Sequence, residues 1–402
     1  MTDLPPPSLT LTLAAPPHPR CRLCVTVPAK DEADYITDTL QALYKQEDFS
    51  GRPVDPSCYE VILLANNCSD ATADVARDFA ARHPYFQLHV CEVALPREIA
   101  SVGMARKLMM DEAARRLPSN GIIAMTDADT RVDRQWVAAT LRAFDLGARA
   151  VGGRIIVPRG DRTGYRKIHL QDVTYRTLQM LLESMIDPDL EDPWPRHFQH
   201  YGPSLAVDAA AYLACGGMPP VRCIEDAAFA WALERVDVRF VHDPAVRVYT
   251  SDRDSDRVEG VAFSHTLEEW TRMEEENRKP VVFGLQHCIW LFKWKVALRS
   301  AFQRRRGSGL PALAELRNYL QLPPGDLERR IRTAPTFGSL YQEIRQLLER
   351  TPGFSDTPFD EAIRDLRWFT RSVWGNLSSS TRPFGTALPA TGAPGESLPA
   401  SG

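Results

Sequence analysis

No stretch of this sequence of 402 residues is both long and apolar enough to be predicted as a membrane span. The apolar run at residues 281–292 is interrupted by Gln286 and His287, and lysines follow it at once. The N-terminal segment also lacks the basic start and the continuous apolar core of a signal peptide. Both absences favour a protein of the cytoplasm, where thiols stay reduced.

The sequence has no excess of charge of one sign either. Lysine and arginine total 48 against 52 aspartate and glutamate residues, so the formal net charge is -4 at pH 7. A protein whose main partner is nucleic acid usually carries a basic field over its binding domain. Nucleic acid is therefore not expected as a partner, although local basic patches are compatible with this balance.

The eight cysteines form no recognisable metal site. Cys21 and Cys24 make one CxxC pair, but no second pair and no nearby pair of histidines completes a zinc site. This pair enters an expected strand, whereas a redox pair normally follows a strand and opens a helix. Several other cysteines lie in apolar stretches, where a free thiol behaves as a small hydrophobic side chain. A packing role is therefore predicted.

The sequence does contain a repeated alternation of strand and helix patterns. "LCVTVPAK" is a β-branched apolar run, and the next segment places Ile36, Leu40 and Leu43 at helical spacing. Such alternation predicts an α/β fold with a mostly parallel central sheet and flanking helices. Strands are expected at 23–30, 59–67, 87–93, 121–127, 150–158 and from 238 onward, and helices within 31–46, 68–84, 101–117, 164–186 and 223–237.

Two acids end the fourth of these strands, in "IIAMTDADTRV". Asp127 and Asp129 are two residues apart, so in an extended segment both carboxylates point to the same side and can hold a divalent cation. The alternative is that they only solvate a strand end and begin a turn. In parallel sheets, however, ligands bind beyond the carboxyl ends of the strands. One shared edge is predicted for this pair and the other polar residues at strand ends, which are Lys30, Glu32, Asn66 and Asn67.

Four segments, in their order along the chain, resemble the family 2 glycosyltransferases of the glycosyltransferase-A fold. They are "VTVPAKDE", "VILLANNCSDAT", "MTDADT" and "GGMP" followed by "IEDAAF", and together they span about residues 22 to 250. Enzymes of this family move a sugar from a nucleoside-diphosphate sugar to an acceptor. The order and spacing of the four segments make the resemblance more specific than an isolated DxD motif.

The resemblance implies a role for each acid. The family's DxD motif, Asp127 and Asp129 here, holds Mg²⁺ or Mn²⁺ against the donor diphosphate, where a hard cation neutralises the leaving group. The family's ED motif corresponds to Glu225 and Asp226. Asp226 is then the general base that takes the acceptor proton, and direct displacement inverts the anomeric carbon. The alternative is that these two acids only complement the dipole of a helix N-terminus.

Donor binding is implied for residues in several loops. Many members carry an aspartate where this sequence has Ala65, so UDP is not assumed as the donor. Arg106 resembles the family's arginine before the DxD strand, and Arg253 and Arg257 resemble an arginine loop that closes over phosphate. A solvated surface position is the alternative for each. The residues expected at the donor are Pro28, Ala29, Lys30, Glu32, Asn66, Asn67, Arg106, Asp127, Ala128, Arg253 and Arg257.

A third metal ligand and an acceptor segment are also candidates. His242, expected near the end of a strand, is the candidate ligand, although a lone histidine is more often structural. By resemblance, "HFQHYGPSLAV" faces the acceptor and the transferred sugar. Aromatic and imidazole rings suit sugar faces and hydroxyls, and they suit a packed loop equally. The acceptor candidates are Trp194, His197, His200 and Tyr201, while the acceptor itself and the sugar are not predicted.

The family pattern fades after about residue 265, where amphipathic helix patterns follow. The expected organisation is a disordered lead at 1–20, a catalytic domain at 21–264, a helical extension at 265–375 and a disordered tail at 376–402. The extension is expected to cover the site, to self-associate as a homo-oligomer or to dock on a partner. Aromatic and basic residues at 290–306 would suit peripheral contact with an anionic membrane at its inner face, and the alternative is a core helix with a basic end.

Two rival functions stand beside a metal-dependent inverting glycosyltransferase, which is the leading prediction. Nucleotidyltransferases also place paired acids and a metal on a parallel sheet. They usually carry a glycine-rich basic loop after the first strand, and "VPAKDEAD" contains no glycine. An inactive module that only binds nucleotide sugars is compatible with Ala65, but the intact DxD and ED motifs argue against it.

Overall fold

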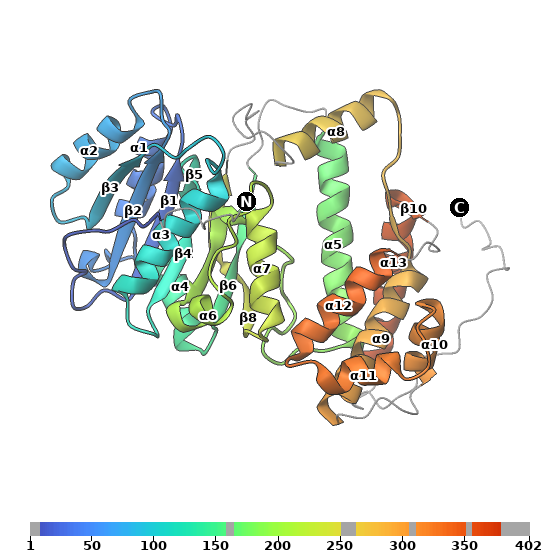
Figure 1. The fold of residues 1–402 in the computed structure, drawn as a ribbon. Helices are drawn as coiled ribbons and strands as arrows, with labels where there is room; N and C mark the ends of the chain where they lie inside the picture. The colour runs from blue at the N-terminus through green and yellow to red at the C-terminus, as the bar shows by residue number, and fades with distance from the viewer. Residues whose placement is uncertain (1–8, 158–164, 251–262, 305–310, 351–355, 379–402) are drawn as a thin grey trace.

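A sheet of eight strands organises the N-terminal part of the protein, and a group of helices forms the rest (Figure 1). The computed structural model describes residues 9–157, 165–250, 263–304, 311–350 and 356–378. The strand order in the sheet is β3-β2-β1-β4-β7-β6-β8-β5. The strands are β1 (Leu23–Ala29), β2 (Tyr59–Asn66), β3 (Leu88–Val93), β4 (Ile122–Met125), β5 (Thr130–Val132), β6 (Ala150–Ile156), β7 (Leu205–Asp208) and β8 (Phe240–Thr250).

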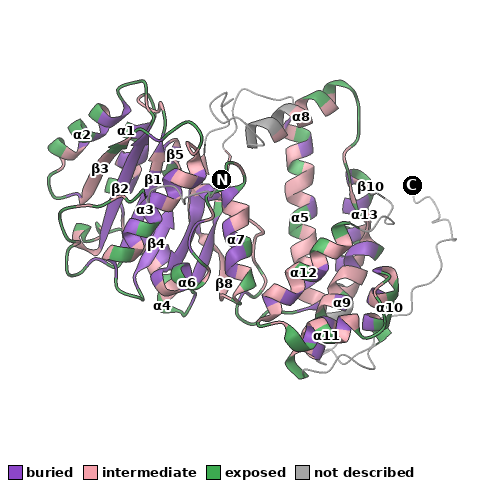
Figure 2. Cartoon of the chain, in the orientation of Figure 1, coloured by how far each residue is buried: buried purple, intermediate pink, exposed green. Residues whose placement is uncertain are grey.

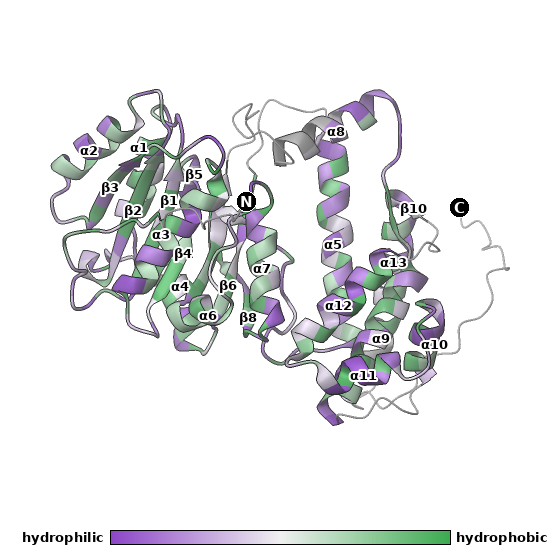
Figure 3. Ribbon diagram, viewed as in Figure 1, coloured by the Kyte–Doolittle hydropathy of each residue, from purple (hydrophilic) through white to green (hydrophobic). Residues whose placement is uncertain are grey.

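β1 and β2 lie in the parallel half of this sheet. β1 pairs in parallel with β2 on one side and with β4 on the other, in a register that sets Leu23 opposite Tyr59 and Ile122. Every residue of β2 is buried, and so are six of the seven residues of β1 (Figure 2). Strands that are covered on both faces need apolar side chains on both, which explains the unbroken apolar runs (Figure 3).

The other half of the sheet is mixed. β7 runs antiparallel to both of its neighbours, β4 and β6, and β5 runs antiparallel to the end of β8, where Thr130 lies opposite Thr250. Four of the seven pairings in the sheet are parallel. Sequence patterns predict neither β5 nor β7, because strands of three and four residues are too short to show a period.

Helices cover both faces of the sheet, and alternate strand residues face them. In β2, Val61 and Leu63 face a cluster with α1, α2 and α4, whereas Ile62 and Leu64 face a cluster with α3, α6 and α7. This arrangement confirms the predicted α/β fold class. The helices are α1 (Ile36–Tyr44), α2 (Thr72–Arg82), α3 (Val102–Arg116), α4 (Trp136–Asp145), α6 (Ala209–Ala214) and α7 (Glu225–Arg235).

α5 (Arg166–Ile186) leaves the sheet and packs among the C-terminal helices (Figure 1). Its Tyr175 and Leu182 are buried in one cluster with Cys288 of α9 and Leu366 of α13. A domain boundary at residue 264 would therefore separate α5 from the helices that it contacts. These are α8 (Phe263–Glu275), α9 (Leu285–Arg304), α10 (Pro311–Tyr319), α11 (Asp326–Thr333), α12 (Phe337–Glu349) and α13 (Phe359–Ser378), with the antiparallel strands β9 (Val281–Phe283) and β10 (Asp356–Pro358) beside them.

α9 is a packed helix of this group. Trp294 is 1% exposed, in a cluster of apolar side chains from α9 to α12. Lys295 Nζ lies 2.6 Å from Glu183 Oε1 on α5. Because Trp294 and Lys295 are engaged within the protein, α9 fits the core-helix alternative better than a membrane-facing one. No helix in the described ranges is both long and apolar enough to cross a membrane.

Candidate active site

Carboxylates from two separate segments converge on one arginine. Asp127 and Asp129 follow β4, Glu225 and Asp226 open α7, and Arg106 projects from α3. Asp127 interacts electrostatically with the other four side chains. The structure therefore brings together the two acid motifs, which are about a hundred residues apart in the sequence.

Arg106 lies at the centre of this group. Its side chain is 3% exposed, and an arginine is buried to this extent only with partners. Nη2 donates to Asp127 Oδ1 at 2.5 Å, and Nη1 donates to the Gly202 carbonyl oxygen at 3.2 Å. Nε forms an ion pair with Glu225 Oε1 at 3.1 Å. All three nitrogens face the chain itself, so Arg106 orients the acids instead of reaching out toward a phosphate.

Two glycines allow the backbone to approach Arg106 this closely. A Cβ atom at Gly202 would lie 2.3 Å from Arg106 Nη2, well inside contact distance. A Cβ atom at Gly103 would lie 2.2 Å from the carbonyl oxygen of Val221 and 3.2 Å from Glu225 Cβ. The start of α3, the turn at residue 202 and the start of α7 are therefore packed tightly around the guanidinium.

Backbone donors hold Asp226 at the first turn of α7. Its Oδ2 accepts the N–H of Gly202 at 2.8 Å, and its Oδ1 accepts the N–H of Ala227 at 2.7 Å. Ile224, which precedes the helix, has a φ of 51°, and a β-branched residue adopts this left-handed conformation only under constraint. Asp226 itself is half-buried, so the carboxylate is oriented and still accessible. The Asp226 carboxylate can therefore accept a proton from a group that approaches from the solvent side.

The site carries more negative than positive charge. Burial raises the pKa of Asp127 to about 6, Arg106 opposes this shift, and the three neighbouring acids add to it. Burial also raises the pKa of Glu225 against the opposing charge of Arg106. Asp127, Glu225 and Asp226 all interact with the one guanidinium of Arg106, and a divalent cation would add positive charge beside them.

The residues present fit a divalent metal ion at Asp127 and Asp129. Carboxylate oxygens are the ligands that Mg²⁺ and Mn²⁺ prefer. The bond to Arg106 uses one oxygen of Asp127 and leaves the second oxygen without that bond. Among the described residues, these two acids belong to no group of three ligand atoms within 4.8 Å of one another. Two protein carboxylates would therefore account for only part of a coordination shell.

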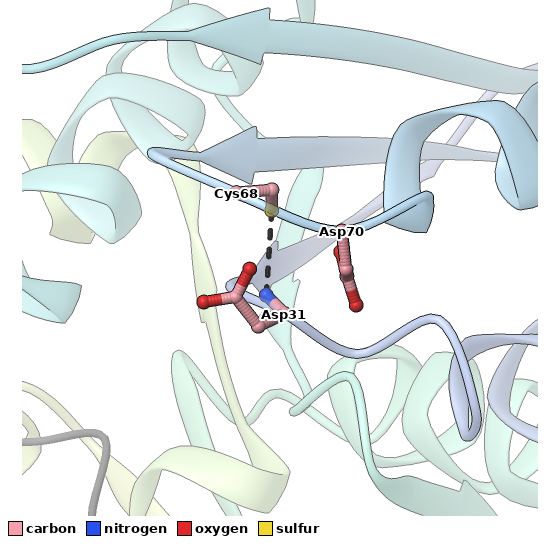
Figure 4. Close-up of side chains that lie close together, drawn as sticks. All are labelled: Asp31, Cys68 and Asp70. Carbon is pink, nitrogen blue, oxygen red and sulfur yellow. Dashed lines mark hydrogen bonds between the residues drawn. The ribbon is translucent and has the colours of Figure 1, made fainter.

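Asp31, Cys68 and Asp70 do form such a group of three (Figure 4). Their hydrogen bonds give it a structural explanation. Asp31 Oδ1 accepts the N–H of Ser69 at 2.6 Å, and Asp70 Oδ1 accepts the N–H of Thr72 at 3.0 Å. The N–H of Asp31 points to Cys68 Sγ at 3.4 Å, the dashed line in Figure 4. These bonds tie the loop after β1 to the loop after β2, both of which are predicted to bind the donor.

The two asparagines at the end of β2 differ in their contacts. Asn67 has a φ of 52°, and its side-chain amide both donates to and accepts from the backbone of Leu95, at 2.9 and 3.0 Å. This amide therefore fixes the loop after β3. Asn66 is 7% exposed, and its Oδ1 has no hydrogen-bond partner among the described residues. Asn66 is thus the member of the pair with a buried acceptor left for a ligand.

The remaining residues expected at the donor contribute backbone more than side chain. Ala29 and Ala128 are 2% and 4% exposed, and the Ala128 carbonyl accepts a threonine hydroxyl of α1 at 2.7 Å. The loop that contains Arg253 and Arg257 lies outside the described residues. Three further positions, half-buried or exposed, lie in β1 and the loop after it: Pro28, Lys30 and Glu32.

His242, the candidate third metal ligand, forms no group of possible ligand atoms with Asp127 and Asp129 among the described residues. It is the third residue of β8, whereas Thr250, at the other end, pairs with the strand that follows the acid pair. The strand between them spans roughly 25 Å. His242 Nδ1 instead lies 2.7 Å from Asp192 Oδ2.

Two other histidines lie on the segment predicted to face the acceptor, and one of them is close to Asp226. Burial lowers the pKa of His200 to about 4, His242 lowers it further, and Asp226 opposes the shift. Burial likewise lowers the pKa of His197 to about 3. The His242 ring centroid lies 5.5 Å from that of His197 and 6.0 Å from that of His200. Of these histidines, the neutral imidazole of His200 is the one that interacts with the candidate base.

Sequence reasoning missed three residues that support the site. Gly202 makes room for the arginine and donates to Asp226. Ser204, two residues later, accepts from Trp136 Nε1 of α4 at 3.1 Å, and both side chains are almost fully buried. The glycine-proline turn at residues 202–203 is a visible signal for the first of these. No sequence pattern connects Trp136 to this turn.

Residues 24–201 match the family model described as glycosyl transferase family 2. The match covers β1 to β6, α5 and the segment up to the glycine-proline turn. Glu225 and Asp226 lie beyond it. The comparison with curated protein sequences gives no match.

Three solved glycosyltransferase structures are similar to this chain at low identity. Mannosyltransferase PcManGT from Pyrobaculum calidifontis, in complex with GDP-Man and Mn²⁺, is 19% identical with a TM-score of 0.41, covering 84% of this chain and 90% of its own. S. aureus TarS 1-349 with UDP-GlcNAc is 13% identical with a TM-score of 0.42, covering 82% and 92%. GalNAc-T7 with UDP, GalNAc and Mn²⁺ is 13% identical with a TM-score of 0.44, covering 83% and 58%.

Proposed function

We propose that this chain, whose residues 24–201 match the glycosyl transferase family 2 model, transfers a sugar from a nucleoside-diphosphate sugar to an acceptor hydroxyl, with inversion at the anomeric carbon. The observation that supports this most directly is the shared arginine. Arg106 contacts Asp127 of the DxD motif and Glu225 beside the candidate base. Direct displacement needs the leaving group and the nucleophile on opposite sides of one carbon, and this contact keeps the two acid motifs together.

On the donor side, Asp127 and Asp129 would hold Mg²⁺ or Mn²⁺ together with the donor diphosphate. When bound, this ion supplies neutralisation of the charge that develops on the departing diphosphate. Arg106 orients Asp127 and favours its charged form, which burial alone would disfavour. Asn66 Oδ1, buried and without a protein partner, would contact the base or ribose of the donor, where Ala65 offers no carboxylate.

On the acceptor side, Asp226 would be the general base. Its oxygens are held by two backbone N–H groups, so a lone pair has a fixed direction toward an incoming hydroxyl. Glu225 would be a positioning residue, because its carboxylate pairs with Arg106 and is buried. His200, neutral and close to Asp226, would contact a hydroxyl of the sugar or of the acceptor.

The Asp226→Asn variant tests the assignment of the base. Asparagine preserves the shape and can still accept the N–H of Gly202, but it cannot take up the proton. We expect donor binding in the presence of Mn²⁺ to be unchanged, measured as a shift in thermal midpoint with a panel of nucleotide sugars. Release of nucleoside diphosphate should fall about a hundredfold or more. Asp127→Asn should lose both metal-dependent donor binding and turnover.

Asp145→Asn is the matched control, because Asp145 is exposed on α4 and its one ion pair among the described residues is with Arg22 at the surface. This variant should keep wild-type turnover. Full turnover in the Asp226→Asn variant would refute the role of Asp226 as base. Consumption of a nucleoside triphosphate with release of pyrophosphate would instead indicate a nucleotidyltransferase. Donor binding by the wild type without any diphosphate release would indicate an inactive binding module.

A further inference from the structure

One face of α13 is basic and aromatic from Arg364 to Arg371, and we propose that it binds an anionic phospholipid surface together with the first turns of α5. Four exposed residues form this face at helical spacing, and they are Arg364, Arg367, Trp368 and Arg371. Trp368 is 66% exposed. The proposal does not depend on the reaction that the sheet domain catalyses.

The opposite face of α13 is a packed core face. Ala362, Ile363 and Leu366 are buried there in the cluster that includes Tyr175 and Leu182 of α5. The helix is thus amphipathic, and the exposed residues between positions 364 and 371 include three arginines and a tryptophan. A tryptophan left this exposed gains nothing from packing in the protein. Its ring is suited to a boundary between apolar and aqueous surroundings.

A groove between α5 and α13 extends this surface. Leu170 of α5, 51% exposed, lies in it beside the basic side chains. The groove is lined from α5 by Arg166, Lys167, Leu170, Gln171 and Thr174, and from α13 by Asp360, Ile363 and Arg367. Cations surround an apolar side chain in this groove, a combination that matches a phosphate headgroup with the first part of an acyl chain below it.

Two of the acids near this surface form ion pairs, one with a lysine outside the surface and one with an arginine of the surface itself. Asp360 pairs with Lys279 at 2.9 Å, and Asp365 pairs with Arg364 at 3.3 Å. Glu361 is exposed at the start of the helix. No carboxylate of the described residues forms an ion pair with the other cations of the surface, which are Arg166, Lys167, Arg367 and Arg371. The local charge is therefore positive although the whole chain has a net charge of -4.

This combination favours a lipid surface over other polyanions. Each lysine or arginine near an anionic bilayer adds to the attraction. An exposed aromatic ring adds a favourable contact with the headgroup region, and a purely ionic partner offers no such contact. α13 would lie along the bilayer surface with its buried face still on α5. The membrane contact of the protein would then lie on α13 and not on α9, whose Trp294 and Lys295 are engaged internally.

Vesicle flotation of the full chain tests the proposal. The protein should bind vesicles that contain phosphatidylglycerol, should not bind vesicles of phosphatidylcholine alone, and should dissociate as salt is raised. The triple variant R364Q/R367Q/R371Q should lower the partition coefficient about a hundredfold, at about fivefold for each arginine. The control R52Q/R82Q/R134Q removes the same charge from exposed arginines of the sheet domain and should bind like the wild type.

Further measurements distinguish direct lipid contact from nonspecific adsorption. Brominated phosphatidylglycerol should quench tryptophan fluorescence in the wild type, and Trp368→Phe should lose most of that quenching while the thermal midpoint stays unchanged. Equal binding by the triple variant and its control would overturn the proposal, as would an absence of binding to anionic vesicles. A protein that shifts a single-stranded oligonucleotide through the same arginines without binding vesicles would also overturn it, in favour of a nucleic acid partner.

Discussion

Gly202 matters to the site because it has no side chain. Its carbonyl oxygen accepts from Arg106, its N–H donates to Asp226, and the space where a Cβ atom would stand is occupied by the guanidinium. The arginine cannot move away without breaking its contacts with Asp127 and Glu225. The position of the buried Arg106 side chain thus depends on a turn that contributes only backbone atoms to the site.

Substitution of Gly202 by alanine should therefore impair catalysis more than folding. The added Cβ atom would lie 2.3 Å from Arg106 Nη2 and should displace both acid motifs. We expect turnover to fall about a hundredfold, which is the usual cost of misplacing a reacting group by roughly 1 Å. Diphosphate release and thermal midpoint, measured on the same preparation, check this expectation.

Gly216→Ala provides the comparison. Gly216 has a φ of 89° and no atom within 4 Å of its would-be Cβ, so alanine there costs about 1 kcal/mol of backbone strain without a clash. This variant should be destabilised and still active. If the turnover of the two variants falls in proportion to their loss of stability, the steric explanation for Gly202 is wrong.

Much of the site could be predicted residue by residue, but its contacts could not. The rule that ligands bind beyond strand ends brings Asp127 and Asp129 to one edge, and the structure places Glu225 and Asp226 there too. For Arg106 the sequence suggests a phosphate ligand, whereas its buried environment makes it a partner of the acids. Only the three-dimensional path of the turn at residue 202 reveals this, because that path depends on contacts distant in the sequence.

Among the secondary-structure elements, β2, β3 and α3 are joined by a buried ionic group away from the site. Arg116 at the end of α3 donates to both oxygens of Glu60, at 2.9 and 2.6 Å, and His89 Nε2 lies 3.1 Å from Glu60 Oε2. Glu60 is 2% exposed. Burial alone would raise the pKa of Glu60, but the hydrogen bonds from Arg116 and His89 lower it to about 2.

The contribution of Glu60 to the stability of the fold should therefore decrease as the pH is lowered. Because the pKa is lower in the folded chain than the ordinary value of 4.5, the contribution is complete above about pH 4.5 and is lost as the pH falls toward about 2. We expect Glu60→Gln to lower the free energy of unfolding by about 3 kcal/mol at pH 7. The difference from wild type should shrink on acidification, measured by urea unfolding at a series of pH values.

Glu92→Gln is the control for this measurement. Glu92 is a 57% exposed residue of β3 whose partner, Arg77, is also exposed. An ion pair of this kind contributes less than about 1 kcal/mol, so the variant should differ little from wild type at any pH. A Glu60→Gln penalty that stays constant from pH 7 to low pH would contradict the assigned role of the carboxylate charge.

The elements that sequence patterns predict well are those with long, buried or periodic runs. β1 and β2 are predicted because both of their faces are apolar, while α4, β5 and β7 are not predicted. In α5 the helix is predicted, but the sequence does not fix its buried face, because Leu170 is half exposed whereas Tyr175 and Leu182 are buried. The partners of α5 come from a part of the chain more than a hundred residues away.

In the molecule as a whole, the C-terminal helices cover two elements of the sheet domain. They bury one side of α5, and α12 packs on α7 so closely that a Cβ atom at Gly338 would lie within 2 Å of the Glu234 carbonyl oxygen. The N–H of Gly338 donates to Asp237 Oδ1 at 2.6 Å. The helix that begins with Glu225 and Asp226 is therefore fixed at its other end by α12.

A chain that ends at Thr250 should not behave as an independent domain. It would keep the sheet and α5 but expose Ile168, Tyr175 and Leu182, which the C-terminal helices bury. We expect this truncated protein to aggregate or to bind a hydrophobic dye, measured by size-exclusion chromatography and dye fluorescence. The same truncation with these three residues changed to glutamine should be less aggregated. A monomeric truncated chain with unchanged α5 would show that the sheet domain is self-sufficient.

The pairing of one guanidinium with carboxylates from two distant segments has an energetic consequence. Asp127 and Glu225 both draw on the positive charge of Arg106, so removal of either acid leaves more of that charge to the other. Losses measured for Asp127→Asn and Glu225→Gln should consequently not sum in the double variant, because the two acid motifs are energetically coupled through Arg106.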